Sequence, residues 1–170
     1  NVFNYLKSLE SKQDRYKFIP ASGGLLRNGK NLNLGFSCFA LKSFYITGLW
    51  DQLTNNEKKS WIEYINSFQT NAKGYPDNSF IDLNYLKGFT YLDLMRLSKK
   101  TLKNLLNLTR LYSFEKDSKI KTDGIRAESK QAISTLFQVN ERNNLKYSDF
   151  PHKNNEIRSF LEKLNWNKPW

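Results

Sequence analysis

The sequence has very little of the chemistry that disulfides, metal sites and redox centres use. It contains one cysteine and one histidine among 170 residues, which excludes an intramolecular disulfide within this chain and nearly excludes a zinc site. Cys38 stands among Phe36, Phe39 and Leu41, a setting that favours a core residue over a reactive thiol. We therefore expect neither a metal nor another cofactor.

Other signals are equally scarce. His152 follows Pro151 in a polar stretch with no evident catalytic partner, so we expect an ordinary surface residue. Gly23-Gly24 is not followed by the Gly-Lys-Ser/Thr of a phosphate-binding loop and is typical of a turn. No stretch resembles a signal peptide, and no apolar run reaches the roughly 20 residues that cross a bilayer. These absences, with the single cysteine, lead us to expect a cytoplasmic protein.

What the chain has in excess is positive charge and aromatic side chains. Its net charge is +11, from 27 Lys and Arg against 16 Asp and Glu. That balance favours a polyanionic partner such as nucleic acid, an anionic membrane face or an acidic polysaccharide. The abundant Lys, Asn, Ile, Phe and Tyr are also what an A+T-rich genome imposes on any protein, so both explanations stay open. The 15% aromatic content indicates a packed core.

Apolar periodicity predicts an all-α fold with no strand. Thr54 and Glu57 have the spacing of a capping box, and Gly74 with Pro76 ends the element that follows. Ser98 is expected to cap another helix. Residues 115–124 are charged and are expected to form a loop. The expected helices span residues 2–12, 34–50, 54–69, 80–97, 99–114, 125–140 and 155–164.

Two kinds of helix alternate in this pattern. The helix at 34–50 is apolar around nearly its whole circumference, as a helix surrounded by others is. The helix at 54–69 carries Glu57, Lys58 and Glu63 on one side, as an outer helix does. Alternating inner and outer helices predict a layered ring or solenoid.

Two short self-matches suggest an internal repeat. Residues 4–10 align without a gap on 63–69, and residues 37–44 align on 129–136. Self-similarity is typical of units that cannot bury their apolar faces alone. Matches of this length also arise by chance in leucine-rich helices, so the repeat is a hypothesis at this point.

One motif carries a family resemblance. Residues 64–69 read YINSFQ and are followed by Gly74 and Tyr75, a pattern similar to the Gln/Trp repeat motif of the terpenoid cyclases and protein prenyltransferases. Those proteins are α/α toroids, rings of inner and outer helical hairpins around a central cavity. The resemblance implies that Gln69 binds backbone groups at a neighbouring helix end and that Tyr75 takes the place usual for Trp. Glu10 would replace Gln in the first copy, without the following Gly.

The catalytic motifs of these families are absent from the sequence. The Asp-x-Asp-Asp acid of squalene-hopene-type cyclases is absent, as is the Asp/Cys/His zinc set of the prenyltransferases. Heparinase-type polysaccharide lyases use similar toroids without the Gln/Trp motif and remain an alternative. A complete ring needs more helices than we expect here. We therefore expect residues 1–170 to form a single helical-repeat domain, an incomplete toroid and a fragment of a longer chain that supplies the remainder.

Two groups of polar residues are candidates for a site. Asp123, Arg126 and Glu128 stand at the expected start of the helix at 125–140, where Arg and a helix N-terminus can hold an anionic group. In the alternative interpretation these residues are only structural. Asp123 then caps the helix, the negative charge of Glu128 interacts favourably with the helix dipole, and Arg126 is exposed to solvent. The second group follows the turn at Gly74 and comprises Tyr75, Asp82 and Tyr85, which also have a purely structural alternative.

Three functions fit the sequence. The first is an enzyme, or part of one, whose aromatic-lined cavity takes an isoprenoid, a saccharide or another anionic ligand. The second is a non-catalytic helical-repeat module. The third, a basic nucleic-acid binder, is disfavoured because the lysines between 99 and 121 are interleaved with leucines and no nucleic-acid-binding motif is present. A carboxylate and a tyrosine that face one cavity would favour the enzyme.

Overall fold

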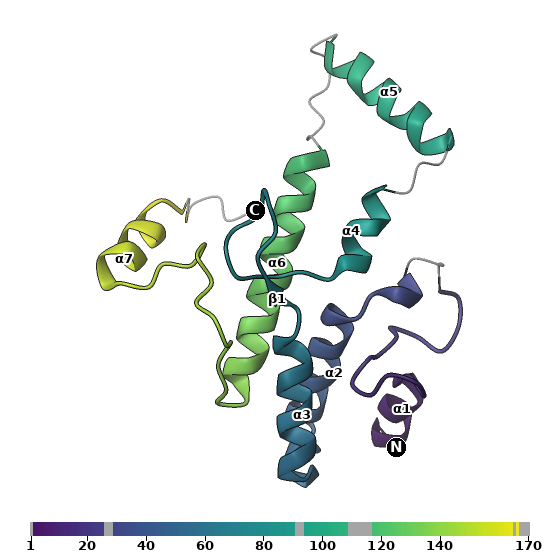
Figure 1. Ribbon diagram of the computed structural model, residues 1–170, viewed down its shortest axis with the longest axis vertical. Coiled ribbons are helices and arrows are strands. Elements are labelled where there is room, and N and C mark those ends of the chain that lie inside the picture. Colours follow the sequence, from purple (N-terminus) through teal and green to yellow (C-terminus); the bar gives the residue numbers. More distant parts are fainter. Residues whose placement is uncertain (1, 26–28, 91–93, 109–116, 165, 167–170) are drawn as a thin grey trace.

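A computed structural model describes residues 2–25, 29–90, 94–108, 117–164 and 166. In these ranges the chain is mainly helical, with a single two-stranded antiparallel sheet (Figure 1). The strands are β1 (Gln69–Thr70) and β2 (Ser79–Phe80), so the expectation of no strand is wrong. The helices are α1 (Val2–Leu9), α2 (Leu34–Ile46), α3 (Asn55–Asn66), α4 (Leu83–Thr90), α5 (Leu94–Leu108), α6 (Asp117–Gln138) and α7 (Asn154–Glu162).

Several predicted boundaries are wrong. The expected helix at 80–97 is not one element, because Phe80 belongs to β2 and α4 ends at Thr90. Ser98 lies inside α5 and is not a cap. The expected loop at 115–124 is helical from Asp117 onward, since α6 starts there. The remaining residues of that loop, and residues 91–93 between α4 and α5, lie outside the described residues.

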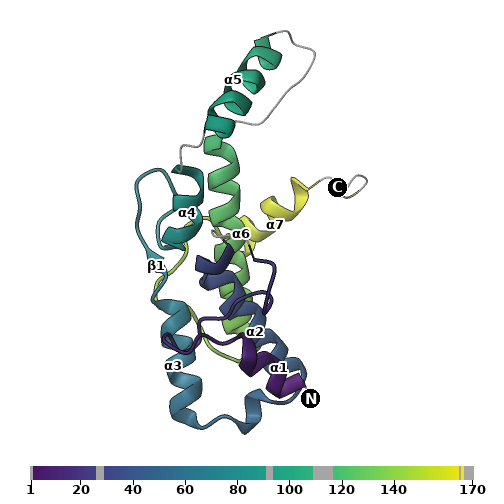
Figure 2. The same ribbon diagram turned by 90° about the vertical axis from the view of Figure 1, so that its right-hand side faces the viewer.

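The core is built where α2, α3 and α6 meet. Helix α2 packs against both α6 and α3, whereas α5 and α7 project away from these three helices (Figures 1 and 2). Leu41 and Phe44 of α2, Ile65 of α3 and Leu136 of α6 are fully buried there. The capping box that the sequence predicts is present: the Thr54 hydroxyl accepts the Glu57 N–H, and the Glu57 carboxylate accepts the Thr54 N–H.

Trp61 of α3 is the aromatic centre of this core. Its ring stacks on those of Tyr16 and Phe18, each with centroids 5.3 Å apart, and meets Phe44 edge-on at 5.1 Å. Its indole N–H donates to the Ser37 hydroxyl at 2.9 Å, which satisfies the buried donor. Trp61 thereby joins the loop after α1 to α2 and α3.

The two stretches of one self-match make similar contacts. Ser37 and Ser129, which align in it, are both fully buried and both accept an N–H at 2.9 Å, the first from Trp61 and the second from the Phe80 backbone. The helices that carry them, α2 and α6, pack against each other. The aligned serines therefore occupy similar buried positions, while a true internal repeat stays a prediction.

The segments after α1 and α3 match as well. Glu10 pairs with Phe18 in an antiparallel bridge, as Gln69 pairs with Phe80. The Ile19 N–H donates to the Leu9 carbonyl and the Ile81 N–H to the Phe68 carbonyl, both at 2.9 Å. The helices α1 and α3 are thus each followed by a short antiparallel pairing, and α4 and α5 separate the second one from α6. These contacts do not show a closed toroid, which stays a prediction.

We predict that Trp61→Ala lowers the free energy of unfolding by about 3–5 kcal/mol, because it removes a buried ring and its hydrogen bond. Phe137→Ala is the matched control, since the Phe137 side chain is 77% exposed, and should cost under about 1 kcal/mol. Urea denaturation followed by circular dichroism measures both. Equal costs for the two variants would contradict the central place given to Trp61.

Candidate acid–base site

The site begins with Asp82, in the turn between β2 and α4. Its side chain is almost completely buried, and its carboxylate accepts three backbone N–H groups. Oδ2 accepts from Asn33 at 2.6 Å and from Leu34 at 3.2 Å, and Oδ1 accepts from Asn84 at 2.9 Å. Asp82 therefore caps the start of α2 from 48 residues further along the chain, since no side-chain cap comes from Asn33 itself.

Glu128 of α6 lies next to the backbone of Asp82. One oxygen of its carboxylate, Oε2, is buried and has no hydrogen-bond partner among the described groups. Burial and, second to it, the negative charge of Asp82 together raise the pKa of Glu128 to about 7, against a smaller lowering effect of the nearby Asp82 backbone. Glu128 therefore changes its charge near neutral pH, where a general acid or base works best.

Tyr85 of α4 approaches the same face of α6. A Cβ atom at Gly124 would collide with the Tyr85 hydroxyl, so glycine is required there for this approach. Gly124 and Glu128 are four residues apart and share one helix face. Burial raises the pKa of Tyr85, and the charges of Glu128 and then Tyr75 raise it further. Tyr85 consequently stays protonated as a hydrogen-bond donor.

The structure brings together four of the six candidate residues and separates the other two. Asp82 and Glu128 influence each other through charge, as do Glu128 and Tyr85, and half-buried Tyr75 acts on Tyr85 in the same way. Asp123 and Arg126 lie in the second and third turns of α6, not at its start, because the helix begins at Asp117.

Arg126 is occupied by carboxylates of the protein itself. Its Nε lies 2.8 Å from Asp149 Oδ2, although the N–H is not aligned for a hydrogen bond. Its Nη1 lies 3.6 Å from Asp123 Oδ1. With two acidic neighbours, the guanidinium is poorly placed to attract an anionic ligand.

Gln69 has a clear role in the structure. Its amide donates to the Leu145 carbonyl at 2.6 Å and to the Asn78 carbonyl at 3.0 Å, and it accepts the Leu145 N–H at 2.8 Å. It thus binds backbone groups, as the resemblance implies, but those of the segment after α6 and not those of a helix end. Asn66 adds an equivalent contact with the Asn144 N–H. No ring stack of Tyr75 is seen among the described residues.

A groove of about 550 Å³ opens on the other side of Asp82. It lies between the start of α2, the end of α3 with β1, and the start of α4. Asp82 lines it, whereas Glu128 does not. Sequence reasoning missed this groove, including Asn33 and Asn84, because asparagine is common in this chain and nothing marks these two.

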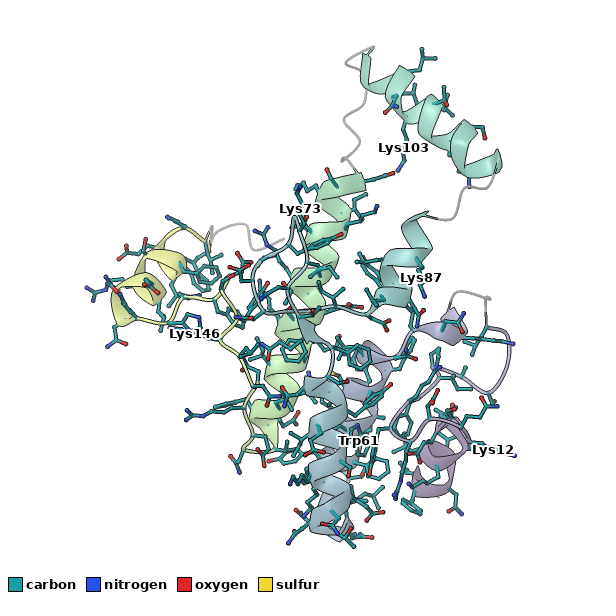
Figure 3. The ribbon with its side chains drawn as sticks, viewed as in Figure 1. Lys12, Trp61, Lys73, Lys87, Lys103 and Lys146 are labelled. Atoms are coloured by element: carbon teal, nitrogen blue, oxygen red, sulfur yellow. The ribbon has the colours of Figure 1, made fainter. Side chains whose placement is uncertain are left out.

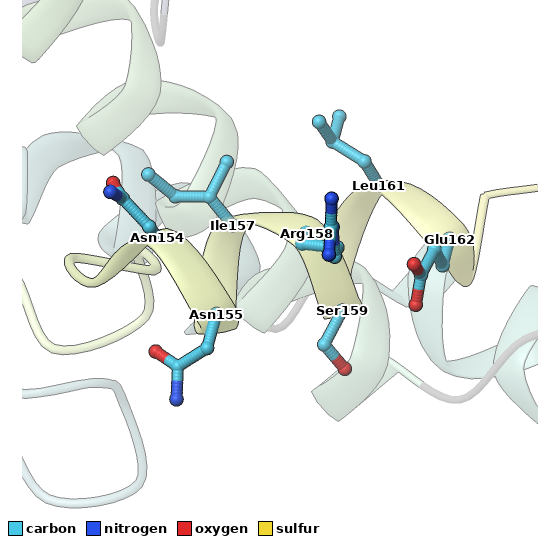
Figure 4. A pocket seen from close by; sticks show the side chains of 7 residues that line it. All are labelled: Asn154, Asn155, Ile157, Arg158, Ser159, Leu161 and Glu162. Atoms are coloured by element: carbon cyan, nitrogen blue, oxygen red, sulfur yellow. The ribbon is translucent and has the colours of Figure 1, made fainter.

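A larger concavity, of about 750 Å³, is formed by α7 alone. Figure 4 shows Ile157 and Leu161 on one side of this helix and Asn155 and Ser159 on the other. Because all the residues of this concavity belong to one helix, it is an exposed apolar face of α7. It does not surround a ligand with polar groups, as a binding pocket does.

The described residues contain no group of three His, Cys, Asp or Glu side chains that could hold a metal ion. The lysines labelled in Figure 3 lie on separate segments of the chain. Within the same residues, no helix is long and apolar enough to cross a membrane.

Comparison with known proteins adds no family. No protein-family model, no curated protein and no solved structure matches this chain significantly. A function for this chain can therefore be proposed only from the geometry of the site.

We predict that Glu128→Gln flattens the pH dependence of stability. Since the pKa of Glu128 is raised in the folded state, the folded protein binds this proton more tightly than the unfolded chain. The resulting stabilisation is complete below the ordinary value of about 4.3 and is lost as the pH rises through about 7. Urea denaturation at a series of pH values in this window measures the slope.

Glu63→Gln is the control, because the Glu63 side chain is 65% exposed and the substitution should leave the slope unchanged. A Glu128→Gln slope equal to that of the wild type would show that Glu128 ionises in the folded protein as it does in water.

Proposed function

We propose that this chain provides an acid–base catalytic centre within a helical-repeat domain, with Glu128 as the proton donor and Tyr85 as a hydrogen-bond donor beside it. One observation carries the proposal: a buried carboxyl oxygen without a partner belongs to a glutamate whose pKa is raised to about 7, next to a tyrosine. Perturbed titratable groups that converge in this way are characteristic of functional sites.

The chemistry that fits is protonation of an oxygen atom that leaves the substrate. Neutral Glu128 gives its proton to that oxygen as its bond to carbon breaks, and the Tyr85 hydroxyl stabilises the charge that develops on the oxygen by a hydrogen bond. Water then adds to the carbon and its proton returns to the Glu128 carboxylate, so that the net reaction is hydrolysis. Asp82 is not a second reacting carboxylate, because its oxygens already accept three backbone N–H groups. Its part is to keep Glu128 protonated by its charge.

The surrounding architecture supports an α/α-toroid relative as the scaffold. The helices α1 and α3 are each followed by a short antiparallel pairing, and Gln69 binds the backbone of a neighbouring segment. In such a scaffold the acid–base centre would face an isoprenoid or a saccharide chain, the two ligand classes that the sequence leaves open.

A non-catalytic binding module is the second candidate. The observation in its favour is that Phe39 of α2 and Phe137 of α6 are 57% and 77% exposed. Exposed aromatic side chains on two packed helices are suited to binding a partner without chemistry. In that case the charge state of Glu128 would have no effect on function.

The test is turnover of a panel of polysaccharides and isoprenoid diphosphates, with products followed by mass spectrometry. We predict that the wild type converts a member of the panel and that Glu128→Gln lowers the rate by about 100-fold or more. Tyr85→Phe should reduce the rate less, since it removes only a hydrogen bond. Glu63→Gln is the control and should retain full activity.

Full activity in Glu128→Gln would refute the role of Glu128. A folded wild type that converts no member of the panel would contradict catalysis and leave the binding module as the better account.

A further inference from the structure

The groove beside Asp82 has the composition of a binding site for hydroxyl groups. Its polar lining consists of side-chain amides and hydroxyls, contributed by Asn33, Ser67, Thr70, Asn71 and Asn84. Three separate segments supply these groups, so they surround the space and are not spread along one helix.

Some of these groups already have partners within the protein. The Ser67 hydroxyl donates to the Tyr64 carbonyl at 2.6 Å, and Asn71 Oδ1 accepts the Asn78 N–H at 2.6 Å. Asn33 Oδ1 is buried, so a ligand in the groove would meet the other, accessible atoms of the Asn33 side chain. Groups that are already paired hold the lining in place, and their remaining donors and acceptors are available to a ligand.

The charge and the apolar surface of the groove narrow the ligand class. Asp82 and Lys87 are its charged side chains and have opposite signs, so the lining is close to neutral overall. Phe68, Ile81 and Leu83 add apolar surface, and the Leu83 side chain is 64% exposed. Sugars need this combination, because they present hydroxyls at their edges and C–H groups on their faces. An isoprenoid would leave the amides and hydroxyls unpaired.

We infer that this groove binds a neutral saccharide chain, with the side-chain amides and hydroxyls of its lining binding sugar hydroxyls and Leu83 packing against a sugar face. Asp82 connects the groove to the acid–base centre, since its side chain lines the groove and its charge acts on Glu128. The inference rests on the proposed function for its substrate class, but binding is measured without turnover.

The experiment is a heteronuclear NMR titration of the protein with neutral hexasaccharides of cello-, xylo-, malto- and chito-type. We predict that at least one of them shifts the side-chain amide signals of Asn33, Asn71 and Asn84. Asn33→Ala should weaken that binding roughly tenfold, as expected for loss of one hydrogen bond in a polar site. Leu83→Ala should weaken it as well without affecting folding, because Leu83 is mainly exposed. Asn55→Ala, at the exposed start of α3, should bind as the wild type does.

The outcomes separate the two proposals. Binding in the groove by both the wild type and Glu128→Gln, without turnover, would support the saccharide site and contradict catalysis. Turnover of a substrate without NMR shifts of the groove residues would contradict the saccharide site but would leave the catalytic proposal standing. Binding of farnesyl diphosphate or a heparin hexasaccharide in place of every neutral sugar would also overturn it.

Discussion

The carboxylate of Asp82 is the constraint on which the candidate site depends. It is buried away from water, where it accepts two N–H groups at the start of α2 and one at the start of α4. A buried negative charge is tolerated only when such hydrogen bonds compensate it. Because Asn33 lies 49 residues before Asp82 in the sequence, this one carboxylate fixes the turn after β2 against the start of α2.

The properties of Glu128 follow from that arrangement. The turn places Asp82 near the Glu128 carboxylate, so that burial and then the charge of Asp82 oppose the ionisation of Glu128 and raise its pKa. Tyr85 reaches this face of α6 only because position 124 has no Cβ atom. A helix interior normally loses stability with glycine. Here the small residue allows the close approach, which is a physical reason for its presence in the middle of α6.

Local sequence signals predicted the elements that depend on local interactions. The capping box at Thr54 is present, and the aligned serines Ser37 and Ser129 occupy equivalent buried positions. The predictions failed where tertiary contacts override local preference. Gly124 suggested a helix boundary, yet α6 runs through it. The two-residue strands β1 and β2 are too short to leave a periodic pattern, and their pairing is set by the hairpin as a whole.

The site could be predicted only as separate pieces. Asp82, Tyr85 and Glu128 were each candidates, but in two groups with different expected roles. Their meeting depends on how α4 packs against α6, and no spacing in the sequence encodes that contact. Arg126 was also a candidate, but it pairs with Asp149 and is therefore not available for the expected anion site.

The most direct test of this account is the pKa of Glu128 in the folded protein, followed by NMR of the glutamate side-chain carboxyl carbons and assigned with Glu128→Gln. The account predicts a midpoint near 7 for one carboxyl group, and Asp82→Asn should lower that midpoint. A Glu128 midpoint near the ordinary value of about 4.3 would contradict the account, because Glu128 would then be an ordinary carboxylate.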